Sequence, residues 1–109
     1  MEFGEQMDID TLREHVRQDR LRLTLHARRE MAAARLCEAE VRESLLCGEM
    51  TATEPGQLGP KYRVQGGTFY TDRVVESVCA LQFDEDADDT YLVLVTVFER
   101  KRKPSGRAK

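Results

Sequence analysis

The stretch Tyr91-Leu92-Val93-Leu94-Val95-Thr96-Val97-Phe98-Glu99 decides the fold, because it reads as a β-strand that is apolar on both faces. One face carries Leu92, Leu94 and Phe98, and the other carries Tyr91, Val93, Val95 and Val97. Thr96 is the single polar residue within the run. A strand buried on both sides is typical of the centre of a sheet. We therefore expect this strand to be central and covered by helices.

The residues before it predict further strands. Val74–Phe83 places Val75, Ser77, Cys79, Leu81 and Phe83 on one face, and the acidic loop Asp84–Asp89 joins it to the last strand. A shorter strand, Lys61–Gln65, ends at the hairpin or bulge signal Gly66-Gly67. Thr68–Tyr70 is a candidate for pairing back. These segments predict an antiparallel sheet of about four strands.

The first half of the chain predicts helices. Asp8 is suited to cap a short amphipathic helix that contains Leu12 and Val16, and an alternating segment over residues 21–25 predicts a brief extended piece. Thr24 is suited to cap a helix over Leu25–Arg35. A further helix, Glu38–Cys47, should end at Gly48 as a C′ glycine. The fold class is therefore α+β, with two or three N-terminal helices packed on the sheet.

Length and charge bound the organisation of the chain. The 109 residues suit one domain, which we expect to span residues 1–99, followed by a basic, flexible tail at 100–109. Six of the 17 basic residues lie in that tail, which has no acidic residue, so the first 99 residues carry a net charge of −9. An acidic body repels a phosphate backbone unless its basic groups cluster on one face. The tail fits a phosphate-contacting arm, although solubilising basic termini are common.

Targeting and metal signals point to a cytoplasmic protein without a cofactor. No apolar run is long enough to span a bilayer, and the acidic N-terminus does not resemble a secretory signal. Three widely spaced cysteines, Cys37, Cys47 and Cys79, favour reduced thiols. Their spacing does not fit a zinc site. We expect no metal, no cofactor and no membrane partner.

Two residues stand out as candidates for chemistry. His26 begins a helix that also carries Arg28, Arg29 and Arg35, and a histidine beside cations is suited to acid–base cleavage of a phosphodiester. A structural histidine at the protein surface is the alternative interpretation. Thr96 must find a hydrogen-bond partner, because burial of a lone hydroxyl costs about 1–3 kcal/mol. That partner would be either the helix of His26 or the sheet itself.

Four short motifs, in order, resemble the family called "domain of unknown function 4258". The first is a helix of the pattern HAxxRMxxRGI, the second a helix ending in glycine, the third a strand with an aromatic residue and glycine, and the last a strand reading TVYE. The resemblance spans roughly residues 23–99. The matching residues are His26, Ala27, Met31 and Leu36; Val41, Leu45, Leu46 and Gly48; Tyr62 and Gly66; and Thr96, Val97 and Glu99.

The resemblance implies about four antiparallel strands backed by two helices, similar to RelE-type toxins and barnase-like ribonucleases. For such relatives the expected activity is metal-independent RNA cleavage or arrest of translation, and the expected partner is an antitoxin. Two positions depart from the pattern, since Glu30 and Ala34 stand where arginines are expected. Arg29 and Arg35 lie beside them.

Two hypotheses follow. In the first, a ribonuclease, His26, Arg29, Arg35 and Thr96 are catalytic, and the RNA backbone is bound by Lys61, Arg63 and the tail. In the second, the domain keeps the fold but not the chemistry and acts as a protein-interaction or dimerisation domain, binding a protein partner or a second copy, for example through a sheet edge. Convergence of the four catalytic candidates in one cleft would favour the first hypothesis.

Overall fold

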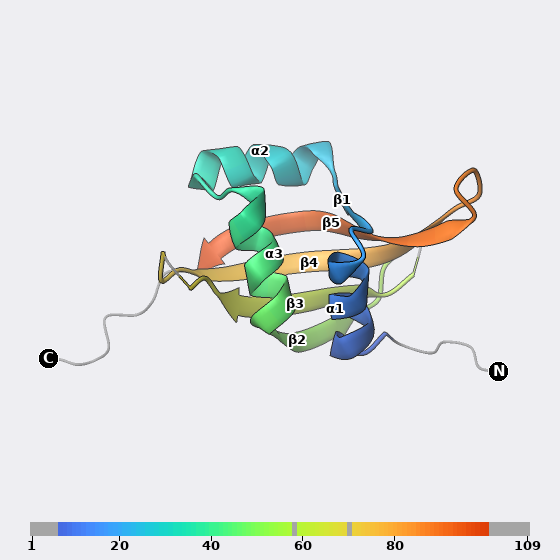
Figure 1. Ribbon diagram of the computed structural model, residues 1–109, viewed down its shortest axis with the longest axis horizontal. Helices are drawn as coiled ribbons and strands as arrows, with labels where there is room; N and C mark the ends of the chain where they lie inside the picture. The colour runs from blue at the N-terminus through green and yellow to red at the C-terminus, as the bar shows by residue number, and fades with distance from the viewer. Residues whose placement is uncertain (1–6, 58, 70, 101–109) are drawn as a thin grey trace, which may run out of the picture.

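The computed structural model describes residues 7–57, 59–69 and 71–100, and Figure 1 shows it with each element labelled. Three helices and five strands make up the described chain, which confirms the α+β class. In chain order they are α1 (Ile9–Arg17), β1 (Leu21–Leu23), α2 (Leu25–Ala34), α3 (Glu38–Cys47), β2 (Glu49–Glu54), β3 (Lys61–Gly67), β4 (Val74–Asp84) and β5 (Asp89–Arg100).

The five strands form one sheet in the order β1-β5-β4-β3-β2. All neighbours are antiparallel except β1 and β5, which run parallel. Two strands are additional to the expected ones: β1, which the sequence indicates only as a brief extended piece, and β2, whose only apolar residues are Met50 and Ala52. The expectation that Thr68–Tyr70 pairs back is wrong: the Thr68 N–H donates to the Arg73 carbonyl and closes a turn. Tyr70 lies outside the described residues.

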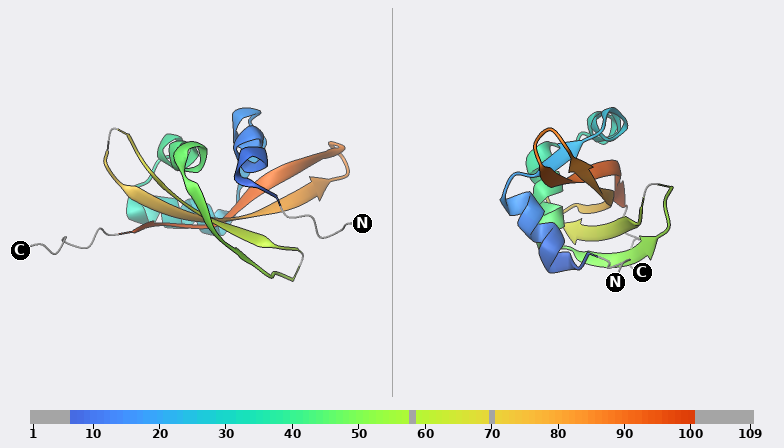
Figure 2. Two further views of the ribbon diagram at one scale, coloured as in Figure 1. Left: turned by 90° about the horizontal axis from the view of Figure 1, so that it is seen from below. Right: turned by 90° about the vertical axis from the view of Figure 1, so that its right-hand side faces the viewer.

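The helices cover one face of the sheet only. Figure 2 shows α1 and α3 on the same side, whereas α2 lies at the level of the sheet, beyond the edge formed by β5. On the opposite face the described residues include no helix. The expectation that helices cover the last strand on both sides is therefore wrong, because α2 lies along the edge of the sheet and not on its second face.

A bulge in β5 changes which side chains face the core. The pairing with β4 passes from Leu94 opposite Cys79 directly to Thr96 opposite Val78, so Val95 is an extra residue. The alternation therefore shifts by one position. Val97 joins Leu92 and Leu94 in the core, and Phe98 turns away from it, with 37% of its surface exposed. The predicted faces of the strand are correct only as far as the bulge.

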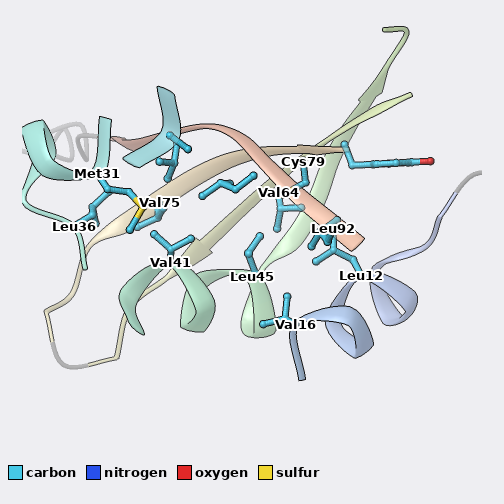
Figure 3. Close-up of a cluster of buried hydrophobic side chains, with 14 of the residues drawn as sticks. Leu12, Val16, Met31, Leu36, Val41, Leu45, Val64, Val75, Cys79 and Leu92 are labelled. Atoms are coloured by element: carbon cyan, nitrogen blue, oxygen red, sulfur yellow. The ribbon is translucent and has the colours of Figure 1, made fainter. Parts of the chain in front are cut away.

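The core lies between the sheet and the two face-covering helices (Figure 3). Full burial of each large apolar side chain contributes about 1.5–3 kcal/mol. The largest fully buried aliphatic side chains are Leu12 and Val16 from α1, Val41 and Leu45 from α3, Val64 from β3, Val75 from β4, and Leu92, Leu94 and Val97 from β5. They come from both halves of the chain, so the helices and the sheet share one core.

The end of α3 lies directly on the sheet because two glycines make room for it. A Cβ at Gly66 would stand 2.1 Å from the Ser44 carbonyl oxygen, and one at Gly48 would stand 2.4 Å from the same atom. Gly48 does end α3, as predicted. Its backbone is extended (φ −85°), however, so the close approach and not a left-handed conformation requires glycine there.

Ser77 provides a test of this core. Its hydroxyl is fully buried and has no hydrogen-bond partner among the described residues. Ser77→Ala should raise the free energy of unfolding by about 1 kcal/mol, because the unsatisfied hydroxyl is removed. Urea denaturation measures the change. Loss of stability by the variant would show that the hydroxyl has a partner in solution.

Candidate functional site

Helix α2 occupies the place of a missing strand along the outer edge of β5. β1 pairs with β5 only as far as Leu94. Beyond it, the Thr24 hydroxyl donates to the Val95 carbonyl at 3.3 Å. The same hydroxyl caps α2, because it accepts a hydrogen bond from the Ala27 N–H at 3.0 Å. The Glu30 carboxylate accepts the Val97 N–H at 3.0 Å. An open strand edge needs such partners, and α2 supplies them.

Arg73 binds the C-terminal end of α2. Arg35 caps the helix just after its last residue, Ala34, with a left-handed φ of 57°. The Arg73 guanidinium donates to the Arg35 carbonyl at 2.9 Å and to the Ala34 carbonyl. The same guanidinium forms ion pairs with Glu40 of α3 at 3.3 Å and with Glu99 of β5 at 2.8 Å. The role of Arg73 could not be predicted from the sequence, because nothing in its local pattern shows that one loop arginine joins three elements.

Glu40 is a partly buried anion of this cluster. The Cys37 N–H and the Thr71 hydroxyl donate to its carboxylate and lower its pKa below the ordinary value of 4.5, an effect that outweighs the opposite influence of burial. The positive charge of Arg73 acts in the same direction. The carboxylate therefore stabilises the fold in its ionised form.

His26 stands at the exposed start of α2 with a carboxylate beside it. Its Nε2 atom lies 3.4 Å from the Glu30 Oε1 atom one turn further along, and 66% of the His26 side chain is exposed. The same Glu30 oxygen binds the Val97 N–H, so the partner of the imidazole is itself fixed to the sheet. An accessible imidazole beside a fixed carboxylate is suited to proton transfer.

The cations of α2 differ from the other arginines of the described chain. Arg28, Arg29 and Arg35 are exposed and have no carboxylate partner within it. Every other described arginine forms at least one ion pair with a carboxylate. These paired arginines are Arg13, Arg17, Arg20, Arg22, Arg42, Arg63, Arg73 and Arg100. The uncompensated arginine charge thus gathers on the one helix that lines the sheet edge.

The four predicted catalytic residues do not form one compact cluster. Arg29 lies one turn from His26 on α2. Arg35 follows the last turn, about 13 Å from His26 along the helix axis. Thr96 is half-buried, and its hydroxyl has no hydrogen bond in the described part of the chain. Its nearest link to the site is through its neighbour Val97, whose N–H binds Glu30.

The predicted substrate-binding residues Lys61 and Arg63 lie on β3, away from α2. Arg63 pairs with Glu54 at 3.2 Å and with Glu76, which Arg100 also contacts at 2.9 Å. Burial alone would raise the Glu76 pKa, but these two guanidinium groups outweigh it and lower the pKa. Lys61 has no carboxylate partner among the described residues. A role for Lys61 and Arg63 in RNA binding stays a prediction, and Arg63 is already neutralised.

Metal-ligand groups and cysteine thiols are the remaining candidate features of the described ranges. Those residues include no group of three His, Cys, Asp or Glu side chains placed to hold a metal ion. The three cysteines are free, as predicted, and burial raises the pKa of Cys79 to about 12, which keeps that thiol protonated at neutral pH. No described helix is long and apolar enough to cross a membrane.

These features define an α+β domain with a basic, histidine-bearing helix along the edge of its sheet. The chain belongs to the family described as "Domain of unknown function (DUF4258)", whose pattern it matches over residues 23–99. That range includes α2, Arg73 and all of β5 except its last residue. No curated protein and no solved structure shows significant similarity to the chain.

The anchoring of α2 by Glu30 can be tested by amide hydrogen exchange. Glu30→Ala should accelerate exchange of the Val97 N–H by up to about tenfold, because a hydrogen bond with a net value of about 1 kcal/mol is lost. Arg29→Ala, at the neighbouring position without a partner, is the control and should leave that amide unchanged. Unaltered protection of Val97 in Glu30→Ala would contradict the anchoring role.

The Glu40 cluster predicts a pH dependence of stability. Because the folded-state pKa lies below the unfolded value, ionised Glu40 stabilises the fold above pH 4.5, and the contribution is lost as the pH falls through the folded pKa. Glu40→Gln should lower stability at neutral pH and make the loss below pH 4.5 shallower. Thermal unfolding across this range measures both effects, and parallel profiles for the two proteins would contradict the assignment.

Proposed function

We propose that the protein binds RNA through the outer side of α2 and cleaves it without a metal ion, with His26 as the proton-transfer group. One observation carries the proposal: the arginines without a carboxylate partner in the described chain are all on α2 or at its end. An arginine already paired must lose its partner before it can bind a phosphate, whereas Arg28, Arg29 and Arg35 need only release counterions.

The spacing of these cations favours an extended single strand. They are spread over two turns of helix, so they fit successive phosphates along a backbone better than one enclosed phosphate group. Beside them lies a shallow depression of about 450 Å³ between α2 and the end of β5, lined by Glu30, Ala33, Ala34, Val97, Phe98 and Glu99. The partly exposed Phe98 ring provides a surface on which a base can stack.

The chemistry assigned to the site is attack of a ribose 2′-hydroxyl on the adjacent phosphorus. His26 accepts the hydroxyl proton, Glu30 holds the imidazole and stabilises its charged form, and the 5′-oxygen leaves with a proton from water. Arg29, on the same side of α2, balances the charge that develops on the phosphate. Thr96 and Arg35 contact neighbouring parts of the RNA strand in this scheme. In this proposal, the toxin-like activity that the sequence resemblance implies adds translation arrest as the cellular effect and an antitoxin as the partner.

Cleavage of a single-stranded RNA by the full chain tests the proposal. His26→Ala should lower the rate by about a hundredfold or more, the usual contribution of a positioned acid or base. His15→Ala is a matched control, because this second histidine lies on α1 and should leave the rate unchanged. Both variants should retain the wild-type circular dichroism. Equal rates for His26→Ala and the wild type would refute the catalytic role.

A second candidate function, a non-catalytic interaction domain, is favoured by the sheet face without a helix. On that face Val93 and Val95 are only half-buried, although they belong to the most apolar strand of the chain. The two functions differ in one observable. An interaction domain without chemistry leaves RNA intact, with or without His26.

A further inference from the structure

The second face of β5 lies in a groove that no part of the described chain covers. The groove has a volume of about 500 Å³, and its apolar lining residues are Ala80, Leu81, Phe83, Val93 and Val95. In Figure 2 (right) this side of the sheet lies opposite α1 and α3 and is concave, because the β2–β3 hairpin curves around it. An apolar sheet face normally packs against a second layer.

The charges on this face argue against a nucleic acid as the covering layer. Arg63 and Arg100 are compensated by Glu54 and Glu76, so most of the face is close to neutral. Lys61, on the wall of the groove, is the exception, since it has no carboxylate partner in the described chain. The groove therefore suits an apolar group accompanied by a negative charge.

The hairpin of β4 and β5 carries that combination. It projects beyond the body of the sheet (Figure 1), and Phe83 within it is 56% exposed. At its base Asp84 and Asp89 are held by Arg22 at 2.7 Å and Arg20 at 3.0 Å. The carboxylates at its tip, those of Glu85, Asp86 and Asp88, have no such partner among the described residues. The tip is therefore acidic, and an exposed aromatic ring lies just before it.

We propose that a second copy of the chain covers the open face. The surface is self-complementary: each copy offers an apolar groove with an unpaired lysine, and each offers an exposed phenylalanine followed by an acidic tip. A two-fold arrangement satisfies both pairs at once, because Phe83 of each copy enters the groove of the other and its tip approaches Lys61 there. The contact leaves α2 free, so it does not depend on the proposed RNA binding.

Sedimentation velocity of the full chain from about 1 μM to about 200 μM covers dissociation constants in the micromolar range and tests the dimer. The wild type should shift from monomer to dimer within this range. Val95→Glu, which puts a charge on the groove floor, should remain monomeric with an unchanged circular dichroism spectrum. Arg29→Glu, which places the same charge on α2, is the control and should dimerise as the wild type does.

A charge exchange tests the orientation of the two copies. Lys61→Glu and the double variant E85K/D86K should each weaken the dimer by about tenfold or more, because like charges then meet twice. An equimolar mixture of these two variants should restore wild-type affinity, since both contacts in the mixed dimer again join opposite charges. The proposal would be overturned if the wild type is monomeric at about 200 μM. It would also be overturned if these variants leave the dimer affinity unchanged. If the monomer instead binds an anilinonaphthalene sulfonate dye, and Lys61→Glu abolishes this, the groove belongs to a small organic anion.

Discussion

The outer edge of β5 imposes the constraint on which the rest of the structure depends. β5 has twelve residues but only three partners in β1, so the main-chain groups beyond Leu94 must be satisfied by something other than a strand. α2 satisfies them through Thr24 at its start and Glu30 in its middle, and Arg73 fixes its end to Glu99. A helix held in this way cannot also cover a face of the sheet.

Two surfaces result from that single placement. Only the inner side of α2, with Ala27 and Met31, is buried, so its arginines are left facing solvent. No described helix covers the far face of the sheet, so Val93 and Val95 line an open groove there. The first surface is cationic and the second is apolar and nearly neutral. The RNA surface proposed on α2 and the self-association surface proposed on the open face therefore lie on different parts of the molecule, and Lys61 is the one residue to which both roles have been assigned.

Local patterns predicted much of the fold and less of the site. The caps Asp8 and Thr24, the strand Tyr91–Glu99 and the end of α3 at Gly48 follow from short-range chemistry that the sequence displays. The bulge at Val95 does not, because it depends on the register with β4. Glu30 and Arg73 were missed for the same reason. Their partners, Val97 and Glu40, are separated from them by 67 and 33 residues.

The salt dependence of RNA affinity tests most directly whether α2 is the RNA-binding surface. In a plot of log affinity against log salt concentration, each cation that contacts single-stranded RNA contributes about 0.7 to the slope. Neutralising Arg28, Arg29 and Arg35 together as glutamines should reduce the slope by about 2, while circular dichroism remains unchanged. A slope equal to that of the wild type would contradict the account and would assign the phosphate contacts to another part of the chain.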